Sequence, residues 1–340
     1  MRNLQLLWSR IVPIILSIAA SFSFAQTTAY HYFRVGNPAD ADATPHAGFA
    51  LMGGGEDLDD AFRWLCERAG GGDLLVLRAT GDDEYNPYIH KLCKLNSVAT
   101  LVIPSQSAAT DAFVAEKIRR ATALFIAGGD QANYINFWSG TPVQAALNTA
   151  IRRGVPIGGT SAGLAVLGEY AYSAQGDKPN DPNLDGKTAM ADPFSPRVTL
   201  VHGFIDIPVL TGIVTDTHFA KRDRMGRLLV FLARMQQQRR ENPEVKKLRG
   251  IGIEERAAVL LEPDGRARVV GNGAAYFIDT AHSHGLLVSG APITYGPYDV
   301  FRVSPGHTFN VKTWQGDAVT YTLSIEAGTV HSTQPGGAVY

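Results

Sequence analysis

The first half of the chain alternates short apolar runs with amphipathic segments. The apolar runs are typical of buried strands and occupy residues 47–55, 73–80, 98–105, 122–129 and 155–160. The amphipathic segments have helical spacing and occupy residues 57–72, 111–121 and 141–154. Continuous apolar strands alternating with helices predict an α/β fold with a mostly parallel, doubly wound sheet that helices cover on both faces.

The second half begins in the same style and then changes. Residues 212–217 have the pattern of a strand, and a long helix with an apolar face follows them. After about residue 265 the segments are short, β-rich and separated by turns, which predicts a β-rich C-terminal extension that packs against the sheet or continues it. We therefore divide the chain into a signal peptide (1–25), an α/β domain (26–265) and the extension (266–340).

The N-terminus has the pattern of a secretory signal. Arg2 and Arg10 precede an apolar run that ends in Ser23-Phe24-Ala25, where small residues suit signal peptidase. A spanning helix needs roughly 20 apolar residues and would be weakened by a proline such as Pro13. An uncleaved membrane anchor is the alternative interpretation. Both predict export, so the expected location is secreted or periplasmic.

Composition narrows the classes of partner. The chain has 31 basic and 32 acidic residues, and no basic run carries interleaved aromatics, so we expect no nucleic-acid partner. No membrane contact is expected beyond export. Gly53–Asp57 ("GGGED") lacks the P-loop lysine, and no Cys/His spacing resembles a zinc site, so we expect no cofactor and no metal. Cys66 and Cys93 either pair in an oxidising compartment or stay as two buried thiols. The oligomeric state stays open, with a homodimer as one option.

A serine turn is the first candidate for chemistry. Ser161 lies between Gly159 and Gly163, after an apolar strand and before a segment that can start a helix. This pattern fits a nucleophile elbow, in which the glycines permit a sharp turn and the N–H of Ala162 forms half of an oxyanion hole. The alternative is a small residue in a crowded corner.

A histidine and several arginines form the second candidate. His218 follows the predicted strand at 212–217, so we expect its imidazole and the Ser161 hydroxyl at the same edge of one sheet, with the histidine acting as base. The alternative is a structural histidine. Arg222, Arg224 and Arg227 come next, and arginines at a helix start suggest a bound anion. Pairing with nearby acids, including Asp216, is the simpler interpretation for any one of them.

The acid that would orient His218 is harder to choose. Asp177 lies in a loop that could reach back to the imidazole, and it is our first candidate. Glu169 is the runner-up, although it would lie about two turns along the elbow helix. Either acid taken alone fits a structural role as well.

Several segments together resemble the cyanophycinases. The matching pieces are GGGEDLDDAF, LLVLRATGDDEYNPYI, LFIAGGDQANY, GGTSAGLAVLGE, TDTHFAKRDRMGRL and GIGIEE, in the family's order over roughly residues 48–290. With the aspartyl dipeptidases, these proteins form a family of serine peptidases whose fold is class I glutamine amidotransferase-like. The resemblance implies that Ser161 is the nucleophile and His218 the base. It also implies that Gly129, beside Gly128, supplies the other oxyanion donor, and that Asp177 lies near the position of the family's acid.

The resemblance also implies a substrate pocket and a substrate. The pocket residues it implies are Gln131, Asp216, Thr217, Arg222, Arg224 and Arg227. The implied activity is that of a secreted serine exopeptidase-type hydrolase, which cleaves cyanophycin (multi-L-arginyl-poly-L-aspartate) to β-Asp-Arg dipeptides. One alternative is a secreted peptidase for other Asp-containing or isoaspartyl peptides. Another is an inactive secreted binding protein on the same scaffold.

Overall fold

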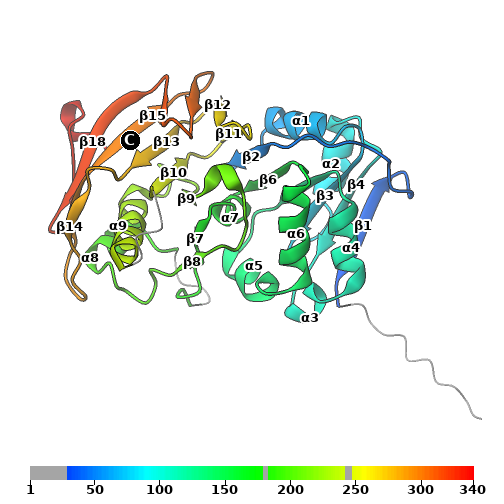
Figure 1. The fold of residues 1–340 in the computed structure, drawn as a ribbon, viewed down its shortest axis with the longest axis horizontal. Coiled ribbons are helices and arrows are strands. Elements are labelled where there is room, and N and C mark those ends of the chain that lie inside the picture. Colours follow the sequence, from blue (N-terminus) through cyan, green and yellow to red (C-terminus); the bar gives the residue numbers. More distant parts are fainter. Residues whose placement is uncertain (1–28, 179–182, 242–246) are drawn as a thin grey trace, which may run out of the picture.

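A computed structural model describes residues 29–178, 183–241 and 247–340, which form two mixed sheets with helices around them (Figure 1). The predicted signal peptide lies outside the described residues. The first sheet runs in the order β1 (His31–Gly36), β4 (Ser97–Val102), β3 (Asp73–Arg78), β5 (Ala123–Ile126), β6 (Ile157–Thr160), β2 (Phe49–Met52), β11 (Ala257–Leu261), β12 (Arg266–Gly271), β16 (Thr308–Asn310), β17 (Gln315–Gly316). The second runs β19 (Thr329–Ser332), β18 (Val319–Glu326), β15 (Thr294–Val303), β13 (Ala275–Asp279), β10 (Arg249–Ile253), β9 (Ile213–Asp216), β7 (Tyr170–Tyr172), β8 (Leu200–His202), with β14 (His284–Leu286) beside β15.

Parallel pairing is confined to the middle of each sheet. In the first, β4, β3, β5, β6 and β2 are parallel, whereas β1 and the strands from β11 onward are antiparallel. In the second, only β7, β9 and β10 pair in parallel. The prediction of one mostly parallel sheet is therefore right for the strands β4 to β2 of the first sheet and wrong for the fold as a whole, which has two mixed sheets. Apolar periodicity locates a strand but does not reveal its partner.

Alternation along the strands builds a core on both faces of the first sheet. Phe49 and Leu51 of β2 point into a cluster with the helices α4 and α6, and Ala50 and Met52 point into another with α1. The helices are α1 (Asp59–Arg68), α2 (Tyr85–Leu92), α3 (Gln106–Ala109), α4 (Ala112–Arg120), α5 (Gln131–Trp138), α6 (Pro142–Arg152), α7 (Ala162–Ala165), α8 (Gly186–Ala191) and α9 (Met225–Glu241). Period-2 apolar residues thus give a sheet covered on both sides, as predicted.

A shared core holds the two sheets together. Ile251 and Ile253 of β10 and Phe277 of β13 belong to the same cluster as Phe49 and Leu51. The opposite face of the second sheet packs against α9 (Figure 1). The ends of strands from different sheets therefore meet at a fixed junction.

The C-terminal residues divide between both sheets. β12, β16 and β17 extend the first sheet, and the other strands after residue 265 extend the second. Strands before and after residue 265 are paired directly in both sheets: β11 pairs with β12 in the first sheet, and β10 pairs with β13 in the second. These strands continue the sheets, which is one of the two arrangements that the sequence left open.

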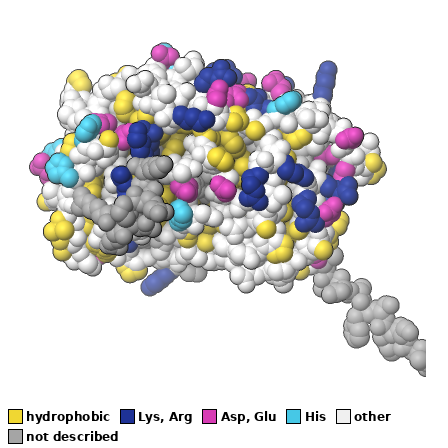
Figure 2. Space-filling view, in the orientation of Figure 1, with side chains coloured by type: hydrophobic (Ala, Val, Ile, Leu, Met, Phe, Trp, Pro, Cys, Tyr) yellow, Lys and Arg dark blue, Asp and Glu magenta, His cyan; other side chains and the backbone are white. Residues whose placement is uncertain are grey.

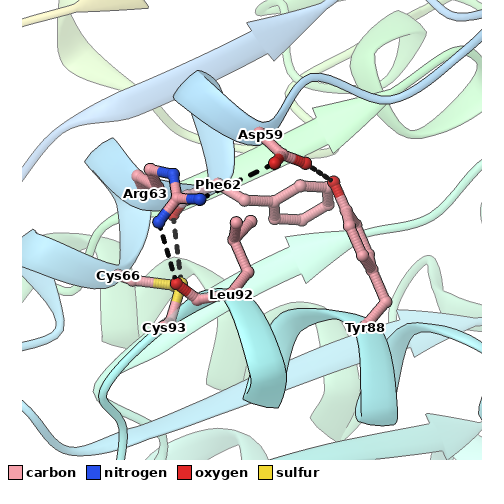
Figure 3. Close-up of a disulfide and its surroundings, with 7 residues drawn as sticks. All are labelled: Asp59, Phe62, Arg63, Cys66, Tyr88, Leu92 and Cys93. Carbon is pink, nitrogen blue, oxygen red and sulfur yellow. Dashed lines mark hydrogen bonds and ion pairs between the residues drawn. A yellow bond between two sulfur atoms is a disulfide. The ribbon is translucent and has the colours of Figure 1, made fainter.

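A disulfide joins the first two helices (Figure 3). Cys66 of α1 and Cys93, directly after α2, are bonded with their Cα atoms 6.1 Å apart. The Arg63 side chain donates to the Leu92 carbonyl at 3.1 Å, and the Tyr88 hydroxyl donates to Asp59 at 2.6 Å. Of the two interpretations of the cysteines, the structure has the bonded one.

The visible surface carries both signs of charge. Figure 2 shows lysine and arginine side chains lying among acidic ones on this face. Within the described ranges, we find no helix with the length and apolar character that a membrane span requires.

Candidate active site

Ser161 lies on a strained turn between β6 and α7. Its φ of 53° is in the left-handed region, which residues other than glycine seldom adopt. A Cβ on Gly163 would come within 2.0 Å of the Ile126 carbonyl oxygen, and one on Gly159 within 2.6 Å of the Gly163 carbonyl carbon. The two glycines are therefore required by the backbone contacts that hold the serine turn in place.

The Ser161 hydroxyl meets the His218 imidazole. Ser161 Oγ and His218 Nε2 are 2.7 Å apart. The predicted meeting of the two side chains is confirmed, but their strands, β6 and β9, belong to different sheets rather than to one edge. His218 is held by its own N–H, which donates to the Gly53 carbonyl at 2.7 Å. Gly54 lies against the ring, since a Cβ there would be 2.5 Å from His218 Cε1. The glycines of "GGGED" thus seat the histidine.

The other imidazole nitrogen contacts a glutamate that the sequence analysis did not select. His218 Nδ1 and Glu255 Oε1 are 2.6 Å apart, and the Glu255 side chain is 29% exposed. Glu255 lies two residues beyond β10, and His218 lies two residues beyond β9. Because β9 and β10 are parallel neighbours, with Gly252 opposite Asp216, their ends deliver the two side chains together.

The two acids proposed for this position lie elsewhere, which corrects the prediction. Asp177 accepts hydrogen bonds from the Tyr172 hydroxyl at 2.8 Å and from Arg197 Nε at 2.6 Å. Glu169 accepts from the Gly212 backbone N–H. The segment that carries Asp177 stays with β7, so its carboxylate is held by neighbours of that strand and not by His218.

Burial and charge set the protonation of the histidine. Burial lowers the pKa of His218, and the nearby Arg222 and Arg224 guanidinium groups lower it further, while the hydrogen bond to Glu255 opposes them. The same hydrogen bond lowers the pKa of Glu255. Near neutral pH the pair is therefore a neutral imidazole beside a carboxylate, which is the form that can accept a proton from the serine.

A glycine pair runs alongside the serine. A Cβ on Gly128 would lie 3.5 Å from Ser161 Cβ. The Tyr134 hydroxyl is 2.8 Å from the Ala127 carbonyl and 3.1 Å from the Gly128 carbonyl, which fixes this turn from below. Ala162 is the first residue of α7. The predicted oxyanion donors, the N–H groups of Gly129 and Ala162, thus belong to the two segments next to Ser161, and their role stays a prediction.

Comparisons with known proteins agree with this geometry. Residues 50–199 match the model of Peptidase family S51. A cyanophycinase of Synechococcus elongatus is 26% identical over 288 residues, covering 79% of this chain and 81% of the relative. A cyanophycinase of Geminocystis herdmanii is 28% identical over 207 residues, covering 59% and 66%. These matches support a cyanophycinase-like peptidase of family S51.

The fold also has a solved counterpart. The crystal structure of a peptidase from an acI-B1 Actinobacterium superposes with a TM-score of 0.50 at 15% identity, covering 79% of this chain and 98% of that one. This likeness supports the fold alone. The amidotransferase-like class stays a prediction of the resemblance.

Two of the residues predicted to bind substrate bind each other instead. Arg227 donates to both oxygens of Asp216, at 2.8 and 2.5 Å, and also to the Leu184 carbonyl at 2.8 Å. The two side chains are only 1% and 2% exposed. Arg227 and Asp216 therefore form a buried structural pair whose charged groups are closed to solvent. Arginines near a helix start therefore do not show by themselves whether their partner is a carboxylate of the protein or an anionic ligand.

The other predicted pocket residues differ in exposure. Arg224 is buried and donates at 2.9 Å to both the carbonyl and the hydroxyl oxygen of Thr217. Arg222 is exposed, and its guanidinium has no partner among the described residues. Gln131 is buried at the start of α5 and lines a cavity of about 440 Å³ with Gly129 and Asp177. Of the three arginines predicted to bind substrate, Arg222 alone has a guanidinium without a partner among the described residues.

Within 29–178, 183–241 and 247–340, no three His, Cys, Asp or Glu side chains are grouped so that they could hold a metal ion.

Proposed function

We propose that this chain is an exported serine peptidase that cleaves the aspartate backbone of cyanophycin and releases β-Asp-Arg dipeptides. The observation that carries the proposal is the continuous hydrogen-bonded chain from Ser161 Oγ through His218 to Glu255 Oε1, with links of 2.7 and 2.6 Å. An alcohol, an imidazole and a carboxylate in this order form the arrangement that activates a serine nucleophile.

The proposed reaction is acyl transfer in two steps. Ser161 Oγ attacks the scissile carbonyl carbon while His218 Nε2 takes the hydroxyl proton, and Glu255 stabilises the imidazolium that forms. His218 then gives that proton to the leaving amine as the carbon–nitrogen bond breaks. Water attacks the acyl-serine ester with His218 again as base, which releases the carboxylic acid and restores the serine. The N–H groups of Gly129 and Ala162 would hold the oxyanion in both steps.

The charges at the site suit this substrate. Cyanophycin presents α-carboxylates and guanidinium groups from the arginines that are joined to its aspartate side chains. The exposed Arg222, close enough to affect the pKa of His218 and of Glu255, is a suitable partner for a carboxylate. The cyanophycinases among the relatives support the choice of polymer.

The disulfide supports export. A bond between Cys66 and Cys93 is expected to form and persist in an oxidising compartment. We propose that residues 1–25 direct the chain there and are removed. Expression of the full chain in a bacterium, fractionation and intact-mass measurement test this; a cytoplasmic protein that keeps its N-terminus would contradict it.

The decisive experiment for the activity is incubation with purified cyanophycin and identification of products by mass. We expect β-Asp-Arg from the wild type and intact polymer with Ser161→Ala. Release of aspartate from α-Asp or isoaspartyl dipeptides without attack on the polymer would favour the broader peptidase alternative. No turnover and no labelling by a fluorophosphonate would favour a binding protein.

A further inference from the structure

A second cavity lies beside Gly128, next to the nucleophile. Its volume is about 420 Å³, and it is lined by Asp57, Arg78, Glu84, Tyr85, Tyr88, Ala127 and Gly128. Gly128 is in contact range of Ser161 Cβ, and Asp57 is near the Thr160 hydroxyl, one residue before the nucleophile. The cavity of Gln131 lies beside Gly129. The cavity lined by Asp57 thus adjoins Gly128, and the cavity lined by Gln131 adjoins the next residue, Gly129.

Asp57 has hydrogen-bonding capacity that the protein leaves unused. Its Oδ2 accepts a hydrogen bond from the Tyr85 hydroxyl at 2.7 Å, whereas its Oδ1 is buried and has no hydrogen-bond partner of good geometry. Burial raises the pKa of Asp57, and the hydroxyls of Tyr85 and Thr160 oppose that rise. A buried carboxylate oxygen without a donor is unfavourable, so the Asp57 carboxylate favours a cation in the cavity that it lines.

The other walls carry both signs of charge and two aromatic rings. Arg78 Nε and Nη1 donate to the Thr80 and Asp82 carbonyls at 2.6 and 2.9 Å, while Nη2 has no partner among the described residues. The Glu84 carboxylate is exposed and likewise has no described partner. The rings of Tyr85 and Tyr88 are held by their hydroxyl bonds to Asp57 and Asp59, and tyrosine faces attract guanidinium groups.

We propose that this cavity binds one arginyl group of the substrate, with the guanidinium at Asp57 and Glu84 and the α-carboxylate at Arg78. The assignment rests on the proposed function, because an arginine linked through its α-amine keeps both of these charged groups. A guanidinium donates in a planar fork that matches carboxylates, and it stacks on aromatic rings. The carboxylates of Asp57 and Glu84 therefore complement the guanidinium, and the guanidinium of Arg78 complements the α-carboxylate. Asp216, one of the pocket residues that the resemblance implies, is already paired with Arg227.

Binding to the catalytically inactive Ser161→Ala protein tests the assignment without requiring turnover. The ligands are a trimer of β-Asp-Arg units and the same trimer with citrulline, which replaces the guanidinium by a neutral urea of similar size. Calorimetry should show that Glu84→Gln or Asp57→Asn weakens the arginine trimer roughly 10- to 100-fold, while binding of the citrulline trimer changes by less than about threefold. Asp60→Asn, an exposed carboxylate on α1 outside the cavity, is the matched control and should change neither.

Two further measurements complete the test. Arg78→Gln should weaken the arginine trimer but not an agmatine trimer, which lacks the α-carboxylate. Glu84 is exposed, so Glu84→Gln keeps the fold even if Asp57→Asn does not. An arginine-to-citrulline preference that is unchanged in Glu84→Gln overturns the pocket assignment, even when the wild type cleaves cyanophycin. If the wild type leaves cyanophycin intact but Glu84→Gln removes the preference for the arginine trimer over the citrulline trimer, the proposed hydrolysis is overturned and the pocket assignment is supported.

Discussion

Replacing Glu255 by glutamine is the sharpest test of the site. The substitution keeps the size of the side chain and removes the charge 2.6 Å from His218 Nδ1. Two unit charges about 4 Å apart at an effective dielectric constant near 20 interact by about 4 kcal/mol, which is roughly 10³ in rate if the imidazolium forms only in the transition state. Solvent at the 29% exposed carboxylate reduces this, and loss of the correct tautomer adds to it. We therefore expect kcat to fall about 10²- to 10⁴-fold.

Two assays measure this effect. One is the release of β-Asp-Arg from cyanophycin, and the other is the rate at which a fluorophosphonate labels Ser161, which needs no natural substrate. Glu254→Gln is the matched control, because the adjacent Glu254 bonds the Tyr276 hydroxyl at 2.7 Å and the Ala274 N–H at 2.8 Å instead of the histidine. We expect it to keep the labelling rate within about threefold of wild type.

Asp177→Asn distinguishes the two acid assignments. It should keep most of the labelling rate, because its carboxylate bonds Tyr172 and Arg197. If Asp177→Asn instead lost activity by several powers of ten while Glu255→Gln remained within tenfold of wild type, the assignment of Glu255 would be refuted.

Three other substitutions address the surroundings of the site. Arg222→Gln removes a positive charge that lowers the pKa of His218. The acidic limb of the kcat/KM profile, which follows that pKa, should therefore move to higher pH at low salt, and a shift to lower pH would contradict this. Gly54→Ala places a Cβ 2.5 Å from His218 Cε1, and kcat should fall about 10²-fold. Gly71 also has a positive φ but faces open space, so Gly71→Ala should lower kcat little, and equal losses in the two variants would point to backbone strain alone. Arg227→Met removes the closer of two guanidinium partners of the buried Asp216 carboxylate and leaves only Arg224, whose Nη1 is 3.7 Å from Asp216 Oδ1. Denaturant unfolding should show a loss of about 3 kcal/mol, and an unchanged midpoint would rule out the structural role.

The serine and histidine could be predicted because each has a local signal. Ser161 is marked by glycines that the turn requires, and His218 follows a strand directly. Glu255 follows a strand in the same way, and its segment "GIGIEE" belongs to the family resemblance. It was missed because α9 separates it from His218 in sequence, whereas both acids considered lie between Ser161 and His218. That β10 lies beside β9 is a fact of tertiary pairing that periodicity does not contain.

The sheet to which each strand belongs and the partner of each charged side chain could not be predicted for the same reason, because both depend on tertiary contacts. The apolar strands were located correctly, but nothing in β6 or β9 indicates that they belong to different sheets. β1 was missed altogether; it is an antiparallel edge strand without a continuous apolar run. The Arg227–Asp216 pair shows the limit for electrostatics, because side chains 11 residues apart form a closed pair only once β9 and α9 are packed together.

The bond between Cys66 and Cys93 has a consequence for how the protein must be produced. It closes a separation of 27 residues, and chain-entropy estimates for such a loop give about 3 to 4 kcal/mol of stabilisation. The segment between the two cysteines carries Arg78, Glu84, Tyr85 and Tyr88 of the cavity, so oxidation of the thiols constrains the part of the chain that lines it. Preparations from a reducing cytosol would be a different starting material from periplasmic ones, and a thiol titration should precede every kinetic comparison between batches.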